Sequence, residues 1–172
     1  MSLLLVAPLA AEPTPVSNES FGVTLPAGFT AFTEQKQTTK GENGDIATTT
    51  WISKFPTTGE AVVVTMSDMP GKILDPEKMM ASTRDSLVAS LKATVENEQK
   101  IDGDLAFTFK SNGANPAYLQ SRLVVAEDRL YQILYVGRSE EQRAAQSVVE
   151  LFSSFKIVAP PSETVAETAH QH

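Results

Sequence analysis

Alternating apolar and polar positions run through most of the chain between residues 20 and 158. A period of two predicts β-strands, because successive side chains of a strand point to opposite faces of a sheet. Tight turns separate several of these segments, and the pair Asn43-Gly44 predicts a hairpin because both residues tolerate a positive φ. The expected strands are 21–25, 29–39, 46–55, 60–66, 95–101, 105–110, 118–126, 130–136 and a short one at 155–158.

Two segments change to the period of a helix. Residues 75–93 place apolar side chains on one stripe, with Asp75 suited to the N-cap and Pro76 to the first helical position. A capping box that begins at Ser139 opens a second helix, which we expect to end near Ser153. The order of four strands, helix, four strands, helix and short strand predicts an α+β fold, in which two helices cover a mainly antiparallel sheet of six to eight strands.

The ends of the chain differ from its centre. Residues 1–11 are mostly apolar and end in small residues, which is the layout of a secretory signal peptide without its positive start. Residues 12–19 are predicted to be a linker, 20–158 a single α+β domain, and 159–172 a disordered tail. We therefore expect an exported protein, periplasmic or secreted, although a leader with no targeting role remains an alternative.

Composition excludes several kinds of chemistry. The 172 residues include no cysteine, and the only two histidines, His170 and His172, lie in the last three positions. A cysteine nucleophile, a Ser/His/Asp triad within the domain and a Cys/His zinc site are therefore excluded. The net charge of -7 disfavours nucleic acid, since phosphate neutralisation needs a basic surface. The apolar run of the leader is too short to span a membrane, which needs about 20 residues.

Three short motifs lie at the start, middle and end of the domain. They are an entry strand, Phe21-Gly-Val-Thr-Leu-Pro-Ala-Gly-Phe29; a turn into a strand, Ile101-Asp-Gly-Asp-Leu-Ala106; and a late strand, Arg129-Leu-Tyr-Gln-Ile-Leu-Tyr-Val-Gly137, followed by a helix and Leu151-Phe-Ser-Ser-Phe-Lys-Ile157. Together they resemble PsbP-like domains, the group that includes an extrinsic subunit of photosystem II and a Ran-binding nuclear import factor. The resemblance implies an α/β/α sandwich and a bacterial exported member. It also implies a non-enzymatic binder or assembly factor, because most members are of that kind, and it transfers no functional residue.

Two clusters raise the question of metal binding. Asp102 and Asp104 share one turn, but a calcium site needs more oxygen ligands, so we interpret the pair as a hairpin turn. Thioethers also gather near one loop, and clustered thioethers are ligands for copper, although core packing explains them more simply. The methionines concerned are Met66, Met69, Met79 and Met80. The sequence thus assigns no catalytic, cofactor or metal site.

Our first hypothesis is a module that binds another protein of the cell envelope, in an oligomeric state that the sequence leaves open. It would use the apolar loop 67–74 and strand aromatics, if these rings are exposed rather than in the core. The candidate contact residues are Met69, Pro70, Gly71, Ile73, Trp51, Tyr131 and Tyr135. The alternative is a small-ligand or metal-ion binding protein with a pocket between sheet and helix.

Overall fold

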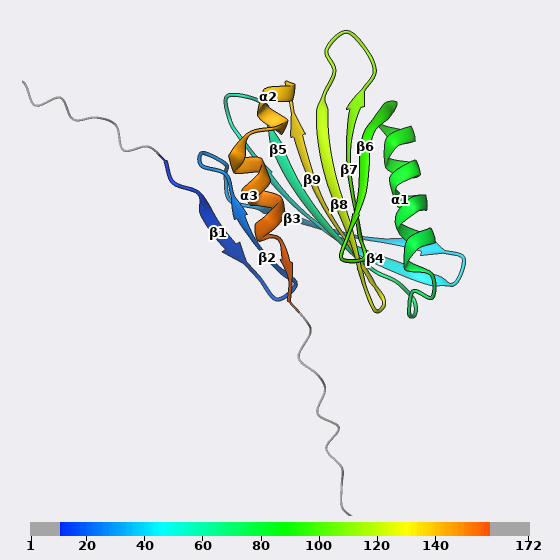
Figure 1. The fold of residues 1–172 in the computed structure, drawn as a ribbon. Coiled ribbons are helices and arrows are strands. Elements are labelled where there is room, and N and C mark those ends of the chain that lie inside the picture. Colours follow the sequence, from blue (N-terminus) through cyan, green and yellow to red (C-terminus); the bar gives the residue numbers. More distant parts are fainter. Residues whose placement is uncertain (1–10, 159–172) are drawn as a thin grey trace, which may run out of the picture.

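The computed structural model describes residues 11–158. The predicted tail, 159–172, and all but the last residue of the predicted leader lie outside the described residues. Ten strands and three helices follow one another as expected for an α+β fold (Figure 1). Their bounds are β1 Thr14–Ser17, β2 Phe21–Leu25, β3 Thr33–Gly41, β4 Gly44–Lys54, β5 Ala61–Asp68, α1 Pro76–Ser90, β6 Ala93–Ile101, β7 Asp104–Ser111, β8 Tyr118–Ala126, β9 Arg129–Gly137, α2 Glu140–Arg143, α3 Gln146–Ser154 and β10 Lys156–Ile157.

Seven strands form one antiparallel sheet in the order β3-β4-β5-β9-β8-β7-β6. Every pair except β5 with β9 is a hairpin between consecutive strands, as the alternation and the turns predict. The pairing of β5 with β9 joins a three-stranded half of the sheet to a four-stranded half. In the sequence, α1 and the strands β6 to β8 lie between β5 and β9. The predicted mainly antiparallel sheet is therefore confirmed.

A second sheet of three strands, in the order β1-β2-β10, shares no strand pairing with the large one. Its central strand, β2, carries the buried side chains Phe21, Val23 and Leu25. The strand β1 lies within residues 12–19, which the sequence predicts to be a linker. This difference has a physical reason: β1 is a four-residue edge strand in which Val16 alone is half-buried, so it has no alternating hydrophobic pattern and is formed mainly by its backbone pairing with β2.

The two faces of the large sheet are covered by different elements. On one face, α3 and the small sheet pack on Val62, Val64, Ile133 and their neighbours. On the other face, α1 contacts β6, β7 and β8, and its buried Met80 packs in one cluster with the side chains of these strands. The layers are visible in Figure 1, with α1 on one side of the sheet and α3 on the other. This arrangement is the expected α+β sandwich.

The predicted second helix is divided in two, which corrects the expectation of one helix from Ser139. Ser139 does cap it, accepting a hydrogen bond from the backbone of Gln142 at 3.2 Å, but α2 ends at Arg143 and Ala145 is extended. The two short helices pack against different parts of the fold: α2 contacts β8 and β9, whereas α3 contacts β2. A local period cannot reveal such a division, because tertiary contacts impose it.

Candidate functional site

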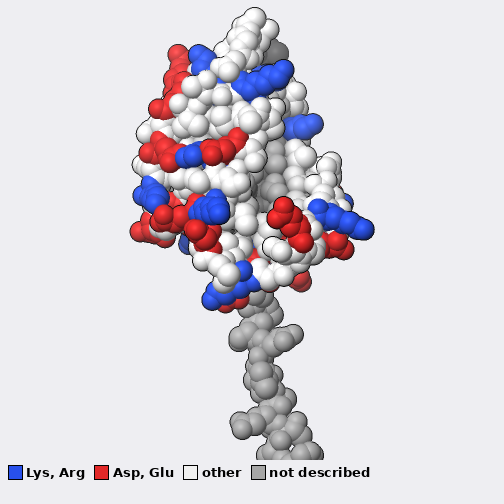
Figure 2. All heavy atoms as spheres, turned by 90° about the vertical axis from the view of Figure 1, so that its right-hand side faces the viewer, with Lys and Arg blue, Asp and Glu red and all other residues white. Residues whose placement is uncertain are grey.

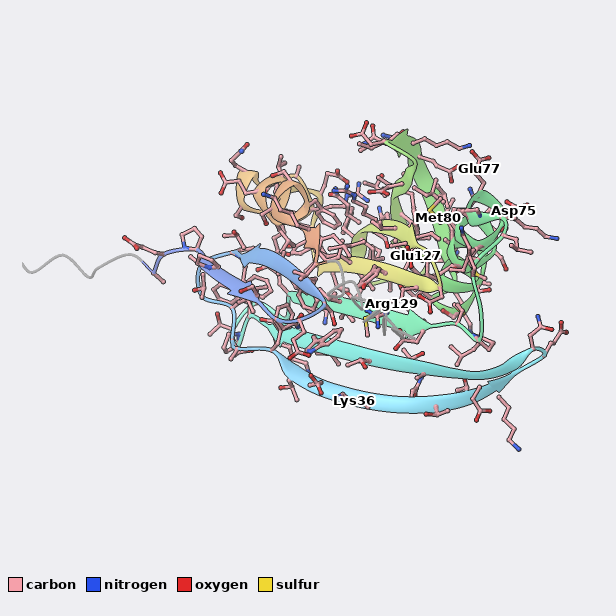
Figure 3. All side chains as sticks on the ribbon, turned by 90° about the horizontal axis from the view of Figure 1, so that it is seen from below. Lys36, Asp75, Glu77, Met80, Glu127 and Arg129 are labelled. Atoms are coloured by element: carbon pink, nitrogen blue, oxygen red, sulfur yellow. The ribbon has the colours of Figure 1, made fainter. Side chains whose placement is uncertain are left out.

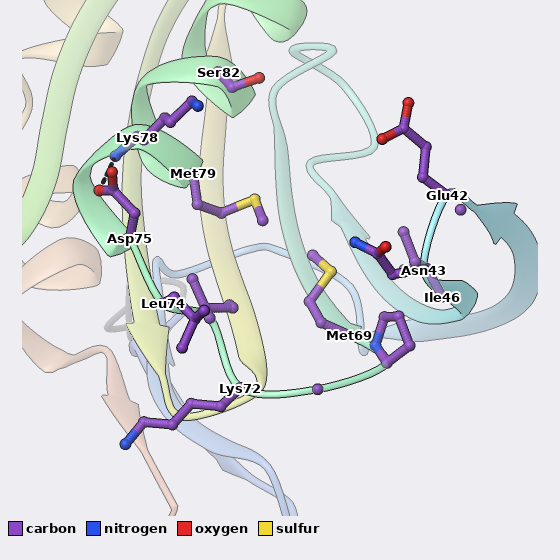
Figure 4. A pocket seen from close by; sticks show the side chains of 14 residues that line it. Glu42, Asn43, Ile46, Met69, Lys72, Leu74, Asp75, Lys78, Met79 and Ser82 are labelled. Atoms are coloured by element: carbon purple, nitrogen blue, oxygen red, sulfur yellow. Dashed lines mark hydrogen bonds between the residues drawn. The ribbon is translucent and has the colours of Figure 1, made fainter.

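A groove lies between α1, the loop that precedes it and the tip of the β3–β4 hairpin (Figure 4). Its volume is about 680 Å³. The apolar lining residues are Ile46, Met69, Pro70, Ile73, Leu74 and Met79. Polar side chains complete the lining: Glu42, Asn43, Lys72, Asp75, Lys78 and Ser82. The size lies within the range of small-molecule pockets, and three separate segments of the chain form the walls.

The loop that forms one wall is fixed by the β8–β9 turn. The backbone N–H of Met69 donates to the carbonyl oxygen of Asp128 at 2.8 Å, and that of Ile73 donates to the carbonyl oxygen of Glu127 at 2.9 Å. Ile73 is only 8% exposed and anchors the loop in the core beneath α1. Its neighbour Leu74 is 91% exposed, so the same fixed loop presents an aliphatic side chain to solvent.

The start of α1 forms the second wall. Asp75 accepts a hydrogen bond from the backbone N–H of Lys78 at 3.0 Å, and Pro76 occupies the first turn, as the sequence predicts. Because Asp75 acts as the cap, its carboxylate is already engaged. The helix then places Met79 and Ser82 along the groove (Figure 4).

The hairpin tip closes the groove from the other side. The pairing of β3 with β4 continues to Gly41 and Gly44, so the hairpin reaches the loop that contains Pro70. Of the predicted pair Asn43-Gly44, only Gly44 has a positive φ, at 134°. A Cβ atom on Gly44 would lie 2.8 Å from Cβ of Pro70. Glycine at this position therefore permits the hairpin and the loop to touch.

The structure brings together one part of the predicted contact set. Met69, Pro70, Gly71 and Ile73 all line the groove, with Ile73 as its buried floor and the other three partly or fully exposed. Sequence reasoning grouped Met79 with Met69 as neighbouring thioethers, but it did not connect the loop with Ile46 or Ser82, which also line the groove. No local signal marks these two, because their role depends on how the hairpin and α1 are placed in space.

The aromatic part of the predicted set requires a correction. Trp51, Tyr131 and Tyr135 are buried in the cluster beneath α3 and the small sheet, with exposed fractions of 7%, 1% and 0%. Phe21 packs edge-on against Trp51, with 5.0 Å between ring centroids. These rings cannot meet a partner, because the alternation that places them on one face of β4 and β9 also places them under a covering layer.

The polar atoms of two of these rings are satisfied by carboxylates. Trp51 Nε1 donates to Glu34 at 2.9 Å, and the Tyr135 hydroxyl donates to Glu60 at 2.5 Å. Hydrogen bonds from Lys36 and then Trp51 lower the pKa of Glu34. Burial, and then the hydrogen bond to Glu60, raise the pKa of Tyr135. Both pairs stabilise the fold and lie away from the groove.

The two groups of residues that raised the question of metal binding occupy ordinary structural positions. Met66 lies in the cluster on one face of the sheet and Met80 in the cluster on the other, whereas Met69 and Met79 share the groove. Asp102 has φ 51° in the β6–β7 turn, which is the conformation of a hairpin residue. Among residues 11–158, no three His, Cys, Asp or Glu side chains gather as a metal site would require.

The groove contains one lysine near a hydroxyl, and this lysine is exposed to solvent. Lys78 and Ser82 lie one turn apart on α1, yet Lys78 is exposed, whereas a lysine that activates a hydroxyl is normally desolvated. Basic and acidic side chains are interspersed over the face that carries α1, as Figure 2 shows. No described helix has the length and apolar content needed to cross a bilayer.

Comparison with solved structures agrees with this architecture. The solution structure of cyanobacterial PsbP (CyanoP) from Synechocystis sp. PCC 6803 matches with a TM-score of 0.54 and 13% sequence identity, covering 91% of this chain and 98% of that chain. No protein-family model and no curated protein sequence matches the chain. The chain thus has the PsbP-like fold, and the resemblance noted in its sequence is confirmed at that level.

Proposed function

We propose that the protein is a non-enzymatic module that binds another protein of the cell envelope through the groove described above. The observation that carries this proposal is Leu74, an aliphatic side chain that is 91% exposed although the backbone beside it is fixed by the Ile73–Glu127 hydrogen bond. Exposed aliphatic side chains that border a concave apolar surface are typical of contact sites.

The surroundings of Leu74 support a macromolecular partner. Met69, Pro70 and Met79 extend the apolar surface across the groove, and methionine adapts its shape to different partner side chains. Lys72, Lys78, Glu42 and Asp75 surround it with both signs of charge. An apolar centre with a mixed polar rim is the usual composition of a protein interface.

The PsbP-like fold and the signal-like leader support the location and the type of role. The resemblance in sequence implied an exported binder or assembly factor, and the fold agrees with that group. We accordingly place the protein in the periplasm or outside the cell. Because many unrelated functions share one fold, the argument for binding rests on the groove itself.

Photo-crosslinking from inside the native cell tests this function. A benzophenone amino acid replaces Leu74 in one chain and, as a matched control, Val149 in another. Val149 is an aliphatic side chain that is also more than half exposed, at 52%, but it lies on α3. We expect one adduct of defined mass from position 74 and none from position 149. Identical adducts from both positions, or none from position 74, would contradict the proposal.

A second candidate function has its own supporting observation. The groove volume of about 680 Å³ suits a small ligand, and Met69 and Met79 offer two thioethers to a soft metal ion such as Cu(I). A ligand of the folded state raises the melting temperature in a saturable way. We would measure that temperature with Cu(I), with Ca²⁺ and with a library of small metabolites. Saturable stabilisation that is lost in Met69→Ala would favour this candidate over protein binding.

A further inference from the structure

The exposed strand edges of the described residues differ in their protection. The edge strand β6 has a bulge between Val95 and Asn97, β1 contains Pro15, and β10 has only two residues. Bulges, prolines, short length and charged side chains are devices that prevent an edge from pairing with another chain. The edge strand β3 has no bulge and no proline, and its nine residues pair with β4 in an unbroken register. Its protection consists of the charges of Glu34, Lys36 and Lys40, which repel a second strand in some registers and attract it in others.

The side chains of β3 are sorted by face. Gln35 and Gln37 lie on the face that α1 shares, with threonines on either side, whereas Glu34, Lys36 and Lys40 lie on the opposite face. Residues 33–40 are exposed, and Figure 3 shows Lys36 on the outermost strand of the long hairpin. Both the backbone edge and the charged side chains of β3 are therefore accessible to a second strand.

Symmetry restricts how two copies of β3 can pair as antiparallel strands. In such a pair, residues that are directly opposite each other point to the same face of the sheet. A two-fold axis between the copies therefore cannot lie between two successive residues, and it must pass between one residue and the same residue of the other copy. If that residue is Gln37, residue 33 lies opposite residue 41 and all nine residues of each strand are paired. In the same register Glu34 lies opposite Lys40 of the other copy, twice by symmetry.

Neighbouring registers are less favourable. A centre at Lys36 places two lysines directly opposite each other, and a centre at Thr38 places Lys36 opposite Lys40. Like charges at such positions destabilise a pair of strands. A centre at Gln35 also avoids like charges, but it pairs only residues 33–37 of β3. The register centred at Gln37 is thus the one that combines full length with charge complementarity.

We propose that a second copy of this chain pairs with β3 in that register. Two seven-stranded sheets then become one sheet of fourteen strands. The two-fold axis is perpendicular to the sheet, so both grooves open on the same face. Gly41 of each copy lies opposite Thr33 of the other. The two Gly41 residues are therefore eight residues apart along the strand direction, which separates the two hairpin tips by about 27 Å.

Disulfide trapping tests the register, because the natural chain has no cysteine. In the full chain with Gln37→Cys, the two Cys residues face each other across the axis at a Cα separation that a disulfide accepts. Gln35→Cys is the matched control: it lies on the same face, but its counterpart in the other copy is about 14 Å away. We expect covalent dimers under mild oxidation from position 37 and monomers from position 35.

Charge exchange tests the Glu34–Lys40 pairing independently. Lys40→Glu places two glutamates opposite each other and should weaken dimerisation about tenfold in sedimentation equilibrium, since two favourable pairs become repulsive. Adding Glu34→Lys to Lys40→Glu should restore the affinity. Because Glu34→Lys also removes the acceptor of Trp51 Nε1, Glu34→Lys alone is measured beside it and should weaken dimerisation, since it places lysines opposite each other. Lys156→Glu, the same charge change at an exposed residue of β10 in the small sheet, is the control and should change the affinity little. Far-ultraviolet circular dichroism checks that each variant folds.

The results separate the proposal from its rivals. Dimers trapped at position 37, with loss and recovery of affinity in the charge exchange, support it. A monomeric natural chain at all concentrations, equal trapping at positions 35 and 37, or no recovery in the double variant would overturn it.

Discussion

One face of the large sheet has two halves that are built in opposite ways. Over β6, β7 and β8 it carries Leu105, Phe107 and Phe109, which are buried together with Met80 of α1. Over β3, β4 and β5 the same face carries mainly uncharged polar and aliphatic residues instead. On β4 and β5 they are Ile46, Thr48, Thr50, Ile52, Ala61, Val63, Thr65 and Ser67, with Lys54 at the end opposite Ala61.

The difference shows how the groove arises. The helix α1 contacts β6 to β8 and leaves the half over β3 to β5 uncovered. The loop before α1 crosses the boundary between the halves, with Ile73 in the packed cluster and Pro70 against the hairpin. A groove therefore forms where the covering layer ends, and its walls come from both halves.

The largest expected effect breaks the packed half. Phe107 is 2% exposed, and Phe107→Ala should lower the free energy of unfolding by about 3–5 kcal/mol, since it removes a ring and leaves a cavity. Thr65→Ala, in the open half, should lower it by less than about 1 kcal/mol. Urea denaturation of both variants measures the contrast. Equal losses would show that the two halves are equally packed.

The next effect concerns binding at the boundary. Leu74→Asp should reduce co-purification of the partner that crosslinking identifies by at least about 30-fold, as loss of a central interface residue does. Its free energy of unfolding should change by no more than about 0.5 kcal/mol, because Leu74 is outside the core. Val149→Asp serves as the control and should leave recovery unchanged. Loss of recovery in both variants would indicate a general effect of added charge.

A smaller effect tests the contact between hairpin and loop. Gly44→Ala introduces a Cβ atom 2.8 Å from Pro70 at a φ of 134°, whereas Gly113→Ala has a similar φ of 126° and no neighbour within 4 Å. Both variants carry backbone strain of about 1–3 kcal/mol. The additional loss in Gly44→Ala, measured by thermal unfolding, reports the hairpin–loop contact. Equal losses would mean that this contact does not hold the groove together.

The last prediction concerns how stability depends on pH, through Tyr135 on the face that α3 and the small sheet cover. Because the pKa of Tyr135 is raised in the folded protein, the folded state keeps its proton above pH 10, where an unfolded tyrosine loses it. Stability should therefore be complete below about pH 10 and fall as the pH rises further. Tyr135→Phe should flatten this fall, as measured by urea denaturation between pH 8 and 12. An unchanged slope would contradict the assignment.

Sequence patterns predicted the elements better than their arrangement. Asp75 and Pro76 marked the start of α1, and the turns marked the hairpins, because these signals are local. The strand β1 was missed, since its pairing with β2 depends on backbone hydrogen bonds that leave no hydrophobic pattern. The break after Arg143 was also missed; that residue is buried and bonds Glu96 on a distant strand at 2.6 Å.

The site was predicted in part for the same reason. An apolar loop around Pro70 and Gly71 is visible in the sequence, and the structure places it at the groove. Which of its side chains is exposed is not visible, since Ile73 and Leu74 look alike in the sequence and have opposite burial. Trp51 and Tyr135 illustrate the converse, because whether a strand aromatic is covered depends on layers that form far away in the chain.

The most direct test uses the methionines as paired reporters. Met69 and Met79 line the groove, whereas Met66 and Met80 lie in the two cores. Methyl NMR spectra of the methionine-labelled chain, with and without the partner identified by crosslinking, follow all four at once. Binding through the groove predicts shifts or broadening at Met69 and Met79, with Met66 and Met80 unchanged. Changes confined to Met66 and Met80, or no change at Met69 and Met79 when the partner binds, would contradict it.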